Sequence, residues 1–171
     1  MTAKNIVGNR HGSAVVTTPS DTEIVIVRDF DAPAELVFKA YTTPELVKQW
    51  WGFETGVWQV CEIDLRVGGR WRYVVQERDM EVAFHGEYLE IDAPHRLVST
   101  EVYEGAPVPD PEAVGTVNIV TLEEKDGLTT MTVLGQCGTK ETRDAIIESG
   151  MEGGMQVSYN RLEDLVREQA A

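Results

Sequence analysis

The chain is poor in basic residues. Lysine and arginine total 15 against 29 acidic residues, which gives a formal net charge of −14. Nucleic-acid-binding proteins neutralise phosphates with clustered basic side chains, and anionic membrane surfaces also attract basic segments. The composition therefore excludes nucleic acid and a membrane surface from the expected partners.

Cysteine and histidine are scarce, and their spacing suggests no metal site. Cys61 and Cys137 are isolated, and His11, His85 and His95 form no ligand-spaced cluster. We expect no metal, no cofactor and two reduced thiols in a cytoplasmic protein. His85 has no identifiable partner for acid–base catalysis.

Long apolar runs and familiar catalytic motifs are also missing. No stretch approaches the ~18 apolar residues of a membrane-spanning helix, and the N-terminal segment lacks the apolar centre of a signal peptide. We find no GxSxG, P-loop, GxGxxG or HExxH pattern. We therefore predict no catalytic residue and lean against an enzyme.

The length of 171 residues and the hydrophobic content of 42% suit one domain. Residues 1–20 are small and polar without a sustained period, so we predict a flexible tail there and a single domain over 21–171. The segment 105–111 holds three prolines and is predicted to be a mobile loop.

Alternating patterns predict a sheet. TEIVIVRDF (22–30) alternates like a strand, and two short helices follow it, each with a proline in its first turn. Short turns separate the later strand-like segments, which favours an antiparallel meander. These segments are 57–65, 69–78, 82–91, 96–104, 115–124 and 128–136.

A long C-terminal helix is predicted over about 140–167. Its apolar stripe comprises Ile147, Met151, Met155, Tyr159, Leu162 and Val166. Glu163 is assigned to the exposed side. Gly150, Gly153 and Gly154 each cost roughly 1 kcal/mol inside a helix, so the helix either bends there or meets a close neighbour.

Four segments in this order resemble one family. They are FDAPAELVFKAYTTPELVKQWWG (30–52), VGGRWRYV (67–74), FHGEYLEIDAPHRLVSTE (84–101) and SGMEGGMQVSYNRLEDLV (149–166). Together they resemble the AHSA1-like family, named after an activator of Hsp90 ATPase, within the START-like (SRPBCC, Bet v 1-like) superfamily. The resemblance implies an α+β helix-grip fold. In that fold, a curved antiparallel sheet of about seven strands surrounds the C-terminal helix, two short helices follow the first strand, and a cavity commonly lies between sheet and helix.

Aromatic residues and methionines are the candidate ligand-binding residues. Three of the four tryptophans stand within 50–58, where the small helices meet the sheet. We predict that part of this group packs as core, Trp50 above all, and that part lines the cavity, although packing alone would also explain the pattern. The face of Tyr88 and of Tyr103 stays open, and Glu101 is assigned to a solvated face. The predicted ligand-binding residues are Trp51, Phe53, Trp58, Trp71, Tyr73, Tyr88, Tyr103, Met151, Met155 and Tyr159.

These features predict a cytoplasmic binding protein for a small apolar or aromatic molecule. One alternative is an enzyme of cyclase or hydratase type that uses the same cavity, as some START-like relatives do. Another is an Hsp90 co-chaperone, which we rank third because the family's activators carry an additional N-terminal domain.

Overall fold

The computed structural model describes residues 11–105 and 115–171. Residues 1–10 of the predicted tail and most of the predicted loop at 105–111 lie outside the described residues. Within them, the strands are β1 (Val15–Ser20), β2 (Glu23–Phe30), β3 (Val57–Ile63), β4 (Arg70–Glu77), β5 (Met80–Asp92), β6 (Arg96–Tyr103), β7 (Thr116–Lys125) and β8 (Leu128–Gln136). The helices are α1 (Ala34–Thr42), α2 (Pro44–Trp50), α3 (Lys140–Glu148) and α4 (Met151–Ala170).

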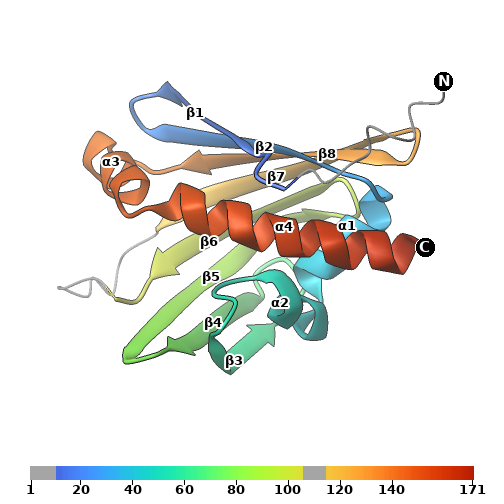
Figure 1. The fold of residues 1–171 in the computed structure, drawn as a ribbon. Coiled ribbons are helices and arrows are strands. Elements are labelled where there is room, and N and C mark those ends of the chain that lie inside the picture. The colour runs from blue at the N-terminus through green and yellow to red at the C-terminus, as the bar shows by residue number, and fades with distance from the viewer. Residues whose placement is uncertain (1–10, 106–114) are drawn as a thin grey trace.

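The strands form one antiparallel sheet in the order β1-β2-β8-β7-β6-β5-β4-β3. Strands β3 to β8 are the predicted meander, and β2 pairs with β8. Helices α1 and α2 carry the chain from β2 to β3 at the far edge of the sheet (Figure 1). All seven strands predicted from the alternating patterns are confirmed.

Helix α4 lies across one face of the curved sheet, and α1 and α2 lie beside its C-terminal half (Figure 1). Its buried side chains include Tyr159, Leu162 and Val166 from the predicted stripe. The inward faces of the strands meet this stripe, and the core of the protein lies between them. This is the predicted helix-grip arrangement.

The predicted C-terminal helix is two helices. Gly150 has a φ of 80° in the left-handed region, so the right-handed helix ends there and α4 begins at Met151. No heavy atom lies within 4 Å of a Cβ built on Gly153 or Gly154, and both are exposed. The suggestion of a close neighbour at these glycines is therefore wrong.

The assignment of Glu163 to an exposed side is also wrong. Its side chain is 1% exposed and lies 3.7 Å from the guanidinium of Arg28, whose side chain is 0% exposed. Glu163 Oε2 also accepts a hydrogen bond of 3.3 Å from the backbone N–H of Asp31. A buried ion pair therefore joins α4 to β2 and to the turn that follows β2.

Part of the predicted tail is ordered in the sheet. Residues 15–20 form β1, in which Val15 pairs with Val27 of β2. Just before it, the side chain of Gln156 on α4 bonds both backbone groups of Ala14, at 3.2 and 2.7 Å. Because the side chains of 15–20 are mostly exposed, their sequence lacks the apolar alternation that predicts a strand.

Candidate functional site

Neighbouring strands place aromatic rings on the inward face of the sheet. Tyr73 on β4 pairs with Phe84 on β5, and Trp71 pairs with Gly86. Trp71 and Tyr73 are buried, with ring centroids 4.8 Å apart. The predicted inward orientation of both side chains is confirmed.

The segment from α2 to β3 adds two tryptophans to these rings. The ring centroid of Trp51 lies 5.6 Å from that of Trp58, 5.1 Å from that of Tyr73 and 5.7 Å from that of Phe84. Trp51 and Trp58 are only half-buried. We call the connected rings of Trp51, Trp58, Trp71, Tyr73, Phe84 and Tyr103 the aromatic cluster.

Gly86 allows Trp71 to lie across β5. The indole Nε1–H donates a hydrogen bond of 3.2 Å to the backbone oxygen of Thr100 on β6. A Cβ on Gly86 would lie 2.5 Å from that indole nitrogen and 1.8 Å from the Thr100 oxygen. A larger residue at this position would displace the tryptophan or the strand.

Tyr159 packs in a second ring group, with Phe30, Tyr41 and Trp50. The Tyr159 centroid lies 6.2 Å from that of Trp50 and 6.1 Å from that of Phe30, and the hydroxyls of Tyr159 and Tyr41 are 3.2 Å apart. Trp50 is 2% exposed and donates to the backbone oxygen of Ala40, which confirms its prediction as core. Through these ring contacts, α4 packs against α1, α2 and β2.

The other predicted site residues differ in burial. Tyr88 is buried and Phe53 is 40% exposed, while Tyr103, in contact with Phe84 at the edge of the aromatic cluster, is 47% exposed. Met151 and Met155 are half-buried on α4 and pack against the core.

Glu101 of β6 is the polar residue that sequence reasoning assigned to the wrong environment. It pairs with Thr116 of β7, and by strand register it also lies opposite Gly86, next to Trp71. Its side chain is half-buried, and burial raises the pKa of the Glu101 carboxyl to about 7. The solvated position expected for Glu101 is therefore wrong. Phe84 was also missed: it lies on the same face of β5 as Gly86 and Tyr88, two and four residues further on, but that face was left open by the sequence.

Three polar groups near these rings lack protein partners. The hydroxyls of Tyr73 and Tyr88 and the carboxyl of Glu101 make no hydrogen bond with any described residue. None of these oxygens is among the fully buried polar side-chain atoms that lack a hydrogen-bond partner in the described structure. Each therefore remains accessible to solvent. Since buried polar groups are normally hydrogen-bonded, these oxygens can bond water or a guest molecule.

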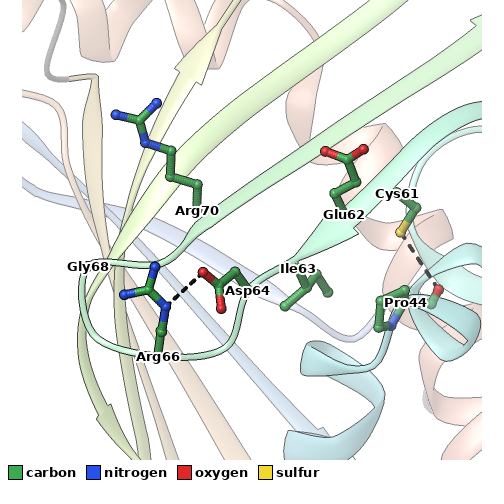
Figure 2. Close-up of a pocket in the computed structure, with 8 residues that line it drawn as sticks. All are labelled: Pro44, Cys61, Glu62, Ile63, Asp64, Arg66, Gly68 and Arg70. Carbon is green, nitrogen blue, oxygen red and sulfur yellow. Dashed lines mark hydrogen bonds and ion pairs between the residues drawn. The ribbon is translucent and has the colours of Figure 1, made fainter.

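A surface hollow of about 540 Å³ lies at the β3 edge of the sheet (Figure 2). Cys61 and Ile63 line it, and their partners across the strands are Tyr73 and Trp71. An ion pair of 2.8 Å joins Arg66 to Asp64 at its rim. A second hollow, of about 550 Å³, lies at the β7–β8 turn and is lined mainly by charged residues.

No group of three or more histidine, cysteine or acidic side chains in the described residues could hold a metal ion. None of the helices in the described part of the chain is long and apolar enough to cross a membrane.

The curved sheet closed by α4 defines a helix-grip protein. The family profile described as activator of Hsp90 ATPase homolog 1-like protein matches residues 31–167, and the chain belongs to this family. A comparison with curated proteins finds no match.

Solved structures of similar fold come from several bacteria. A Rhodobacter sphaeroides protein has a TM-score of 0.80 at 23% identity, covering 91% of this chain and 98% of its own. Protein Ms6760 from Mycobacterium smegmatis has a TM-score of 0.78 at 25% identity, with coverages of 90% and 96%. A Staphylococcus epidermidis protein has a TM-score of 0.76 at 28% identity, with coverages of 92% and 96%.

Proposed function

We propose that the protein binds a small apolar or aromatic molecule between the curved sheet and α4, against the aromatic cluster. The observation that carries this proposal is a cluster of six rings that is incompletely buried and adjoins polar oxygens without protein partners. A purely structural core would enclose its rings and satisfy its polar groups.

The energetics favour a guest at this position. Aromatic side chains dominate binding energetics because each can bury roughly 150–250 Å². Trp51, Trp58 and Phe84 are half-buried and have further surface to cover. Met151 and Met155 add a deformable wall on α4, and methionine adapts to varied apolar shapes. Both cysteines are free thiols, which suits a protein that works in the reducing cytoplasm.

Isothermal titration calorimetry with naphthalene-1-methanol, a neutral aromatic probe, tests the proposal. We expect saturable binding, weakened about tenfold by Met155→Ala, since losing a wall side chain costs on the order of 1–2 kcal/mol. Val157→Ala is the matched control, because Val157 lies on the same helix and is 44% exposed. Absence of binding to the wild type, or equal losses in both variants, would contradict the proposal.

A further inference from the structure

Glu101 is a carboxyl group on the inward face of the sheet, amid aromatic side chains. Along its row of strand partners, Trp71 of β4 and Gly86 of β5 lie to one side and Thr116 of β7 to the other. The indole of Trp71 crosses Gly86 and bonds the residue before Glu101. One edge of the aromatic cluster therefore lies beside the carboxyl.

The ionisable groups that face Glu101 are tyrosines. Its charge raises the pKa of Tyr73 on β4, Tyr41 on α1 and Tyr159 on α4, in each case after the larger effect of burial. Tyr88 on β5 and Cys61 on β3 interact with Tyr73, and burial raises the pKa of both as well. All these groups remain protonated near neutral pH, so Glu101 is the one member of this set that titrates there.

The fold supplies no cation to Glu101 from the described residues. The buried guanidinium of Arg28 pairs with Glu163, and burial alone is responsible for the raised pKa of Glu101. An unpaired carboxylate in a low-dielectric site is strongly stabilised by a cation that reaches it. Aromatic faces attract the same kind of ligand through cation–π interactions, and the net charge of −14 draws cations toward the protein.

We propose that the ligand is an aromatic or apolar amine whose ammonium group pairs with Glu101 while its apolar part covers the aromatic cluster. This inference rests on the proposed function and gives the charge class of the ligand. Glu101 is thus a specificity-determining residue. Because the carboxyl of Glu101 is partly protonated near pH 7, ammonium binding displaces its proton into solvent.

Three probes with one ring system test the charge class: naphthalen-1-ylmethylammonium, naphthalene-1-methanol and naphthalene-1-carboxylate. By calorimetry above neutral pH, the ammonium should bind at least about tenfold more tightly than the alcohol, because a charge-assisted contact contributes roughly 1.5–3 kcal/mol. The carboxylate should bind weakest. In Glu101→Gln the preference for ammonium over alcohol should fall to about threefold or less. Glu87→Gln, which removes an exposed carboxyl from the neighbouring strand, should keep the full preference.

A pH series on the wild type tests the same contact without a variant. The affinity for the ammonium probe should rise toward tenfold per pH unit below about pH 7 and level off above it, with proton release detectable as a buffer-dependent heat. The alcohol should show no such dependence. If the alcohol binds but the ammonium has no advantage and no pH dependence, the amine assignment is overturned while the proposed function stands. If none of the probes binds, both are overturned.

Discussion

Removing the Glu163 carboxylate should be among the most damaging single changes in α4. Glu163→Ala leaves the Arg28 guanidinium in the interior without its 3.7 Å partner and deprives the Asp31 N–H of its acceptor. Breaking a buried ion pair from one side costs about 3–5 kcal/mol. Because whole proteins are stable by about 5–15 kcal/mol, this is a large part of the total. The melting temperature should fall by about 6–20 °C for a chain of this size.

Urea unfolding followed by far-UV circular dichroism measures this loss. Glu168→Ala is the matched control, because Glu168 is an exposed acid on the same helix, and it should stay within about 0.5 kcal/mol of wild type. The double variant Arg28→Met with Glu163→Leu should recover most of the loss, since an apolar pair of similar volume often replaces a buried ion pair without cost. A Glu163→Ala protein as stable as the control would refute the buried pair.

Further expected outcomes concern the glycines, the thiols and Glu101. Gly154→Ala should gain up to about 1 kcal/mol in urea unfolding, because the site is open and alanine favours a helix, whereas Gly86→Ala should lose about 1–3 kcal/mol or more through overpacking. Thiol titration of denatured, unreduced protein should find both Cys61 and Cys137, while Cys61 in the native protein should react slowly near pH 8 because burial raises its pKa to about 11. The folded-state pKa of Glu101, about 7, exceeds its ordinary value of 4.5, so the folded state binds the extra proton. The free energy of unfolding of the wild type should therefore fall as pH rises from about 4.5 to 7, by up to about 3 kcal/mol. Glu101→Gln should lack this pH-dependent loss. Equal pH profiles of the two proteins in urea unfolding would contradict the expectation.

The sheet could be predicted because its signals are local. Period-two alternation and turn residues mark each strand of the meander, and short turns leave neighbouring strands little choice but to pair. β1 was missed because its mostly exposed side chains carry no alternation. The three glycines predicted either a bend or a close neighbour, and the sequence did not decide between them because glycine adopts a positive φ, as Gly150 does, as readily as a negative one.

For Glu163, the residue type suggested exposure, whereas its position in the helix indicated burial. It lies four residues after Tyr159 and three before Val166, and this spacing places it within the buried stripe. Its acidic character suggested the opposite, because charged residues are rarely buried unless paired. The partner, Arg28, stands on β2 far away in sequence, in alternation with Ile26 and Phe30 on the buried face of the strand. The sequence alone therefore does not show that Arg28 and Glu163 form an ion pair.

The inward position of Glu101 could not be predicted from the sequence for a related reason. Leu97 and Val98 on the same strand are both buried, so β6 shows no clean alternation from which the face of Glu101 could be derived. In a chain with 29 acidic residues, solvent exposure is the natural expectation for any one of them. The fold treats the two carboxyls differently, since Glu163 is buried against a guanidinium, whereas Glu101 is half-buried beside Trp71 without an ionic partner among the described residues. The carboxylate of Glu163 is paired inside the protein and contributes to the stability of the fold. The carboxyl of Glu101 has to lose a proton before it is charged, and its charged form is most strongly stabilised by a cation that a ligand brings. That difference is why Glu163→Ala should show its effect in unfolding and Glu101→Gln in the choice of ligand.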